Sequence, residues 1–318
     1  MNITAWSGSK LRTDIDLAEL ARAIAAPKGA VWIDLVDPSR NELEKLAEIL
    51  DLHHLIVEDI IERNERAKIV VSDEYVHIVM FSLTLVDRHL EESEIDFVLG
   101  PHFLLSAHLA DWDPQRSHEL RGGLGPILAK GADFALWALV DDLVDAYFPL
   151  FDQVDEEIDG LEDLILGRTN DSTVKRIFDL KRDLLTIRRV TSPQREVFNQ
   201  LTNRELAFVK PEHIVYFRDV YDHLIRLTDE LDSFRDRLTG ALDAYLSVVN
   251  NNLAEIAKRL TAVTVILATI GAIGGIFGMS EAGPALAGQE LAGFWAITVG
   301  SVALGAVLIV YLRRIGWL

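Results

Sequence analysis

The feature that most constrains this chain is the stretch 260–280, which contains no charged residue. As an α-helix that rises about 1.5 Å per residue, it would extend roughly 31 Å, enough to cross the hydrocarbon core of a bilayer. Steps of three and four residues place small or polar residues on one face, at positions 247, 250, 254, 257, 261, 264, 268, 271, 275 and 278. Such a face either packs closely against another helix or lines a narrow aqueous path, and both interpretations remain open at this point.

A second uncharged stretch, 291–312, predicts another membrane span. Basic residues lie outside the pair of spans and acidic residues lie between them: Lys258, Arg259, Arg313, Arg314, Glu281 and Glu290. Because basic residues concentrate on the cytoplasmic side, we expect a multi-pass protein of the cytoplasmic (inner) membrane with both termini in the cytoplasm. Two spans per chain cannot enclose a pore, so conduction would require a symmetric ring of copies.

Composition excludes several classes of function. The formal charge of −19 argues against nucleic acid as a partner, because phosphates need a basic face. An acidic surface instead attracts cations, although solubility alone also explains it. Cys is absent, which excludes disulfides, zinc–thiolate sites and thiol catalysis. No catalytic nucleophile, phosphate-binding loop or metal-ligand spacing emerges, and the nine His residues form no evident ligand cluster, so we do not expect an enzyme.

The N-terminal third alternates between strand-like and helical patterns. We expect strands at 30–37, 67–73, 75–86, 94–100 and 102–108, and helices at 41–50 and 52–65. Ser39 and Glu42 have the spacing of a capping box at the start of the first helix. These elements predict an α/β domain with a substantially antiparallel sheet.

Helical periodicity continues from Asp133 onward. Residues 133–163 contain eleven acids and no Lys or Arg, whereas the next helix, 173–198, is basic and includes Pro193, which we expect to kink or interrupt it. The opposite charges favour an antiparallel hairpin of these two helices. The one-sign acidic face is also explained by solvation with some attraction of cations.

A single long helix is expected after Pro211. Between Glu212 and Met279 there is no proline, and Gly240 is the one glycine before those of the membrane segment. The expected organisation is therefore a cytoplasmic α/β domain at 1–132, an acidic and basic helical hairpin at 133–211, the cytoplasmic part of a stalk helix at 212–259, transmembrane helix 1 at 260–280, an extracytoplasmic loop at 281–290, transmembrane helix 2 at 291–312 and a basic cytoplasmic tail at 313–318.

The sequence resembles the CorA family of divalent-cation channels over nearly its whole length. The resemblance lies in VWIDLVDP, ALVDDLVDAYF, DEEIDGLEDLIL, YFRDVYDHL, FRDRLTGALDAYLS, IFGMS and GWL. It implies a funnel-shaped homopentamer whose first spans line the pore. It further implies Mg²⁺ with Co²⁺ or Ni²⁺ as substrates, a related ZntB branch that handles Zn²⁺, divalent cations as regulatory ligands, and no prosthetic group.

The resemblance also implies roles for single residues. Gly278, Met279 and Ser280 match the family's Gly-Met-Asn signature, with Ser in place of Asn at the outer pore mouth. Thr269 replaces a usual proline and Ala254 a pore-facing Asn, although Asn250 lies one turn earlier. The remaining matches are an acidic ring at Asp243, a hydrophobic constriction at Leu260, and a regulatory metal position at Asp219 with Asp87 as its partner.

We therefore expect passive entry of Mg²⁺ through a five-fold pore. Thr264, Thr261, Asn250 and Asp243 would pass the ion inward, while Glu281 and Glu290 would concentrate cations at the mouth. A ZntB-like Zn²⁺ transporter, with or without proton coupling, and a non-conducting membrane cation sensor remain alternatives. Asp219 as a salt-bridged helix residue, Asp87 as a turn residue and Ser280 as a helix-terminal residue also remain open.

Overall fold

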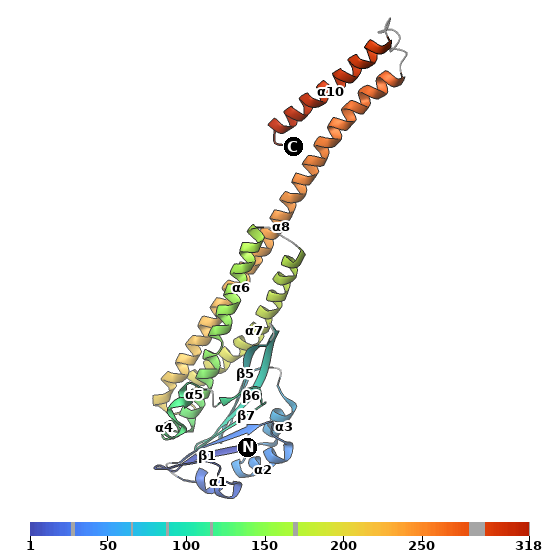
Figure 1. The fold of residues 1–318 in the computed structure, drawn as a ribbon. Helices are drawn as coiled ribbons and strands as arrows, with labels where there is room; N and C mark the ends of the chain where they lie inside the picture. The colour runs from blue at the N-terminus through green and yellow to red at the C-terminus, as the bar shows by residue number, and fades with distance from the viewer. Residues whose placement is uncertain are drawn as a thin grey trace. The chain divides into compact units, whose positions relative to one another are not determined.

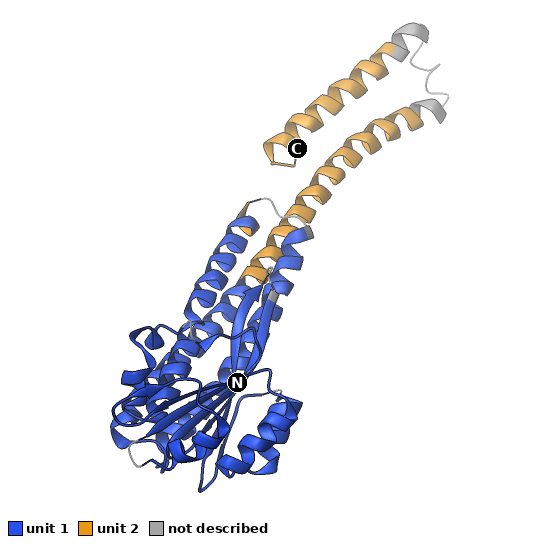
Figure 2. Ribbon diagram, turned by 60° about the horizontal axis from the view of Figure 1, so that its bottom comes forward, with its two compact units in different colours: residues 1–164, 170–240 blue, residues 165–169, 241–318 orange. Residues whose placement is uncertain are grey.

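The structure is a computed structural model that describes residues 1–26, 29–64, 66–86, 89–114, 117–167, 171–279 and 290–317. The chain forms two compact units, one of residues 1–164 and 170–240 and the other of residues 165–169 and 241–318 (Figure 2). The predicted fold class is confirmed: an α/β portion is followed by one very long helix and a further C-terminal apolar helix (Figure 1).

A seven-stranded sheet organises the first unit, in the order β2-β1-β3-β7-β6-β5-β4. The strands are β1 Asn2–Trp6, β2 Leu11–Arg12, β3 Ala30–Val36, β4 Lys68–Val71, β5 Val76–Val86, β6 His89–Leu99 and β7 Phe103–His108. Only β3 and β7 pair in parallel, and the other neighbours pair antiparallel, as the sequence predicted. Burial on both faces of the sheet explains why β3 and β7 read as nearly continuous apolar runs.

Helices α1 Leu17–Ile24, α2 Arg40–Leu50 and α3 His54–Glu62 lie together beside the sheet (Figure 1). Leu20, Leu46 and Ile56 belong to one buried core cluster with Ile33 and Leu105 of the central strands. The predicted capping box is confirmed, since the Ser39 hydroxyl accepts from Glu42 N and the Glu42 carboxylate accepts from Ser39 N. The hydrogen bonds that Ser39 N and Ser39 Oγ donate to the Glu42 carboxylate lower the pKa of this group.

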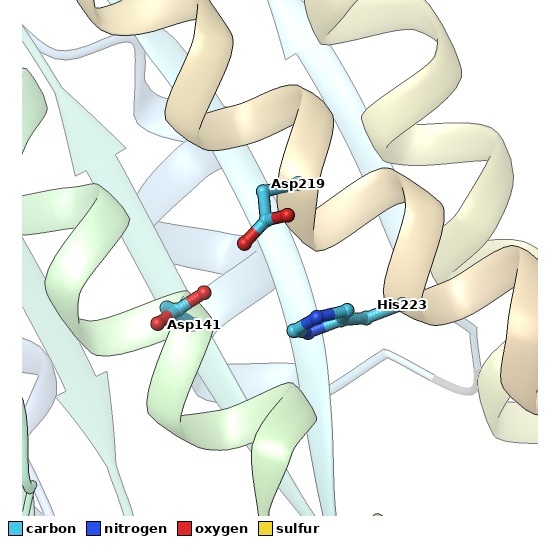
Figure 3. A group of neighbouring side chains, drawn as sticks. All are labelled: Asp141, Asp219 and His223. Carbon is cyan, nitrogen blue, oxygen red and sulfur yellow. The ribbon is translucent and has the colours of Figure 1, made fainter.

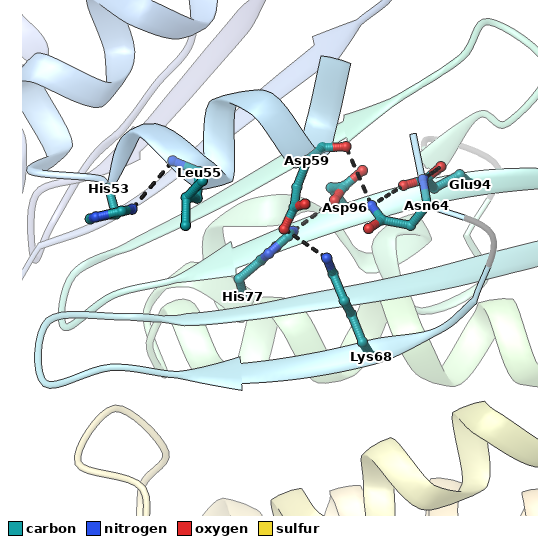
Figure 4. Close-up of polar contacts among 8 residues, drawn as sticks. All are labelled: His53, Leu55, Asp59, Asn64, Lys68, His77, Glu94 and Asp96. Carbon is teal, nitrogen blue, oxygen red and sulfur yellow. Dashed lines mark hydrogen bonds and ion pairs between the residues drawn. The ribbon is translucent and has the colours of Figure 1, made fainter. Parts of the chain in front are cut away.

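Polar contacts join the end of α3 to the sheet (Figure 4). Lys68 Nζ is 2.7 Å from Asp59 Oδ2, and Asn64 donates to both carboxylate oxygens of Glu94. Burial nevertheless raises the pKa of Glu94, with the hydrogen bonds from Asn64 opposing the shift. The contacts hold the loop after α3 over β6.

The remaining elements are η2 Glu119–Gly122, α4 Leu124–Leu128, α5 Ala132–Asp145, α6 Phe148–Leu166, α7 Asp171–Asn203, η3 Pro211–His213, α8 Ile214–Met279 and α10 Glu290–Arg314. The predicted long helix is confirmed, because α8 has 66 residues after one turn of 3₁₀ helix at Pro211. Of the two effects expected of Pro193, the interruption is wrong, since α7 continues to Asn203, and the kink stays a prediction. Buried Val190 and Val197 on both sides of the proline pack this helix in place.

Three acids of α6 pair with α8, and among the described residues no ion pair joins α6 to α7, so the expected attraction between these two helices stays a prediction. Arg237 of α8 contacts Asp155, Asp159 and Glu162, at 2.5 Å from Asp155 Oδ1 and 3.1 Å from Glu162 Oε2. These carboxylates raise the pKa of the guanidinium, the hydrogen bond with Glu162 most strongly. In α7, the basic residues Arg188 and Arg189 pair instead with residues 232 and 92.

Replacing Arg237 by Ala should lower the thermal unfolding midpoint of the first unit. An exposed ion-pair network of this kind contributes about 1 kcal/mol, which corresponds to a shift of about 2–4 °C for a unit of this size. Circular dichroism of the full-length protein measures the shift. Arg235→Ala is the matched control, because Arg235 pairs with Asp232 and Asp236 of its own helix, and an equal shift in both variants would contradict the assignment.

A buried polar chain crosses the two parallel strands. Trp32 Nε1 donates to Ser106 Oγ at 3.0 Å, and Ser106 Oγ donates to Asp34 Oδ1 at 2.6 Å. His108 Nε2 lies 3.1 Å from the same oxygen, and His108 Nδ1 lies 2.6 Å from the Leu109 carbonyl. Both partners of His108 offer acceptor oxygens, an arrangement that is satisfied best when both ring nitrogens carry a proton. Burial lowers the pKa of His108, but these hydrogen bonds more than offset it and the net shift is upward.

The raised pKa of His108 predicts a pH-dependent stability. The protonated ring stabilises the fold fully below its ordinary value of 6.5, and that contribution is lost as pH rises through the higher folded-state value. Urea unfolding between about pH 6 and pH 9 should therefore show wild type losing more stability with rising pH than His108→Gln. His118→Gln, at an exposed position, is the control and should follow wild type. Parallel profiles for wild type and His108→Gln would contradict the assignment.

Candidate functional site

Two helices bring three potential metal ligands together. Asp141 of α5 and Asp219 and His223 of α8 each place one ligand atom within 4.8 Å of the others (Figure 3). Asp219 and His223 are four residues apart, so the helical repeat sets them on the same face of α8. We call these three residues the α5–α8 centre.

The polar atoms of the α5–α8 centre are incompletely satisfied. Asp141 Oδ1 and His223 Nδ1 are buried and have no hydrogen-bond partner in the described part of the chain. Asp145 Oδ1 is 3.1 Å from His223 Nδ1, an ion-pair distance without hydrogen-bond geometry. Buried polar atoms without partners are costly, and a bound cation would satisfy both.

The electrostatics of the centre favour a cation. Burial, together with the negative charge of Asp145 and against the opposing effect of His223, raises the pKa of Asp141 to about 7. Burial likewise raises the pKa of the neighbouring Asp142. Among the described residues, the interactions that stabilise the charged carboxylates are outweighed by burial and by their mutual repulsion. Carboxylate oxygens suit Mg²⁺, whereas a set of carboxylates with one imidazole also suits Zn²⁺, Co²⁺ and Ni²⁺.

The centre differs from the regulatory site that the sequence predicted. Asp219 is present and exposed, but Asp87 lies outside the described residues. Sequence reasoning missed His223, which the structure brings close to Asp141 and Asp219. The signal was available: an acid and a His four residues apart on one helix are a plausible ligand pair. The contribution of Asp141 was hidden among eleven acids.

The second unit contains the predicted spans. Two helical segments, Pro211–Ile276 and Trp295–Arg314, contain stretches apolar and long enough to cross a membrane, and those stretches are only 6% and 11% buried. The small-residue face of α8 is exposed at every position from 250 to 275. Positions 262, 266, 269 and 273, which are buried or half-buried, recur on the opposite face. On that side Ile270 packs against Gly305 of α10. A Cβ atom built on Gly305 would lie 3.4 Å from Ile270 Cδ1.

Hydroxyl groups on the small-residue face have their donors occupied. Thr261 Oγ1 donates to the Ala257 carbonyl and Thr264 Oγ1 to the Leu260 carbonyl, each at 2.8 Å. Each hydroxyl oxygen can therefore act only as an acceptor toward the solvent. Such an oxygen can accept a hydrogen bond from a water molecule that is coordinated to a cation. Leu260, the predicted constriction, is 66% exposed. Asp243 and Asn250 are also exposed.

The outer end of the predicted pore is described only in part. Gly278 and Met279 end α8, and Glu290 begins α10, while their side chains lie outside the described set. Ser280 and Glu281 also lie outside the described residues.

Asp141→Asn and Asp219→Asn should each weaken divalent-cation binding by roughly tenfold or more, because each removes a charged ligand worth about 1.5–3 kcal/mol. Calorimetric titration of the full-length protein with Mg²⁺ and Co²⁺ measures this. Asp229→Asn, an exposed position on the same helix, is the matched control. Equal affinity in all three variants would exclude the centre as a metal site.

Comparison with known proteins places this geometry in context. A family model described as "CorA-like Mg2+ transporter protein" matches residues 27–314. The Cobalt/magnesium transport protein CorA of Thermotoga maritima is 34% identical over 96% of this chain and 88% of its own length. The Zinc transport protein ZntB of Cronobacter sakazakii is 28% identical over 63% of this chain and 60% of its own length. The solved structure of the CorA magnesium transporter from Methanocaldococcus jannaschii superposes with a TM-score of 0.85 at 23% identity, covering 99% of this chain and 98% of that one.

Proposed function

This chain belongs to the CorA family of divalent-cation transporters, and we propose that it is a channel for Mg²⁺, with Co²⁺ and Ni²⁺ as further substrates, in the cytoplasmic membrane. The observation that carries the proposal is the exposed face of α8, where Thr261 and Thr264 have their hydroxyl donors occupied. Mg²⁺ gives up its water reluctantly, so a wall of acceptors that contacts coordinated water suits this ion. No prosthetic group is required.

A homopentamer would assemble the pore. The exposed small-residue face of α8 would turn toward a common axis, and α10, which packs on the opposite face, would surround the ring. Small residues permit the close approach of helices that a narrow path requires. Both termini would lie in the cytoplasm, because Arg313 and Arg314 follow the second span.

The ion would meet several rings in turn. At the outer mouth, Glu281 and Glu290 would concentrate cations, and Gly278, Met279 and Ser280 would contact the hydrated ion. The rings of Thr264 and Thr261 follow, and Leu260 would form a constriction that closes by dewetting. Asn250 and Asp243 would pass the ion to the cytoplasm.

We assign the α5–α8 centre to regulation by intracellular divalent cations. One continuous helix carries both Asp219 and the Thr face, so a ligand that favours one position of α8 biases the pore. Binding would stabilise the closed ring. Asp87 of a neighbouring copy would complete the ligand set in the ring.

Zinc transport is the alternative that a specific observation favours. His223 adds an imidazole nitrogen to the centre, a ligand that Zn²⁺ prefers and Mg²⁺ does not, and this favours Zn²⁺ transport if the ion that regulates the protein is also the ion that it carries. A non-conducting sensor would use the same centre without flux. The three functions therefore differ in which ion, if any, crosses the membrane.

Flux into liposomes that contain the full-length protein tests the proposal. Thr264→Val should reduce Mg²⁺ flux about fivefold, as expected for the loss of about 1 kcal/mol at the Thr264 ring. Thr269→Val is the matched control, because Thr269 makes the same hydrogen bond, to Val265, on the opposite face. An equal reduction in both variants would show that the hydroxyl face does not line the path.

The same liposomes separate the alternatives. Mg²⁺ flux supports the channel, Zn²⁺ flux with pH dependence supports the zinc transporter, and absence of flux supports the sensor. Asp219→Ala should keep conducting at millimolar internal Mg²⁺, where wild type closes. If the variant closes as wild type does, regulation through the centre is excluded.

A further inference from the structure

A cavity of about 520 Å³ lies in the first unit, and none of its lining residues belongs to the α5–α8 centre or to the spans. Its polar and aromatic lining comprises Asn2, Thr4, Thr13, Asp14, Trp32 and Asp34. No Lys or Arg lines it among the residues that the structure describes. A volume of this size is typical of a small-molecule site.

One wall of the cavity is a deeply buried carboxylate. The Asp34 side chain is 8% exposed, and its hydrogen bonds in the described part of the chain, from Ser106 and His108, all end on Oδ1. The other oxygen, Oδ2, is left for the cavity that Asp34 lines. Asp34 Oδ2 makes none of these hydrogen bonds, and a carboxylate oxygen beside the cavity can accept a hydrogen bond from a ligand.

The charges around the cavity favour a ligand that carries one positive charge. The protonated ring of His108 balances the negative charge of the Asp34 carboxylate. Asp14 at the rim has no basic residue beside it in the lining, so its negative charge is not balanced there. The ring of Trp32 lines the cavity while its Nε1 is directed to Ser106, and an indole ring attracts a cation that lies over it. The hydroxyls of Thr4 and Thr13 add further acceptors.

A bare metal ion fits this cavity poorly. The ligand atoms of three acidic or His residues converge in one place in the described part of the chain, and that place is the α5–α8 centre. The cavity is also much larger than an ion needs. We propose that it binds a small organic ammonium compound, whose N–H groups donate to Asp34 Oδ2 and to the rim oxygens while its apolar body lies against Trp32.

Calorimetric titration of the full-length protein with butylammonium tests this inference, with 1-butanol as the neutral probe. Asp14→Asn removes the rim charge, and Asn tolerates the left-handed backbone of this position, where φ is 56°. It should weaken butylammonium binding about tenfold, as expected for one charge-assisted hydrogen bond. Asp51→Asn is the matched control, because Asp51 has φ 53° and does not line the cavity, and it should bind as wild type.

Asp34→Asn should abolish measurable binding, and circular dichroism establishes whether this variant is folded. If it does not fold, Asp14→Asn alone decides the outcome. Equal affinity of wild type and Asp14→Asn, absence of saturable binding, or equal binding of 1-butanol would each overturn the inference. Binding of Mg²⁺ but not butylammonium that depends on Asp14 would also overturn it.

Discussion

An α-helix satisfies its own backbone hydrogen bonds, and α8 depends on this property along its whole length. Because it needs no partner for its backbone, the same helix carries Asp219 and His223 in a polar unit and an apolar segment that is suited to lipid. A proline would remove one of these hydrogen bonds, and α8 contains none. The side chains of its faces then determine what each part of the helix contacts.

Acidic residues serve different purposes within this one chain. Asp133 is buried and accepts hydrogen bonds from His213 and from Lys210 N, so its charge is structural. The acids on α6 surround Arg237 and hold α6 to α8. Asp141 has no comparable partner, and its raised pKa shows the cost of that arrangement. A net charge of −19 does not distinguish these cases, whereas the position of the nearest donor does.

Much of the fold was predictable because its signals are local. Apolar periodicity indicated the central strands and the long helix, and the spacing of Ser39 and Glu42 indicated the start of α2. Sequence reasoning missed β1, β2 and α1, which are short and therefore give weak patterns. It also overestimated the effect of Pro193 on α7. Rules based on neighbouring residues omit the tertiary packing that holds a helix together where one hydrogen bond is missing.

The sequence by itself determined the two apolar segments, the uninterrupted α8 and the small-residue face, because each depends only on residues near one another in the chain. It identified Asp219 through its motif. Tertiary structure alone brought Asp141, 78 residues earlier, close to Asp219 and His223. It also alone determined that Arg237 forms ion pairs with α6 and that Asp34 contacts His108. The physical reason is that these pairings depend on how helices and strands pack, and hydrophobic burial, which drives that packing, does not specify which polar groups meet.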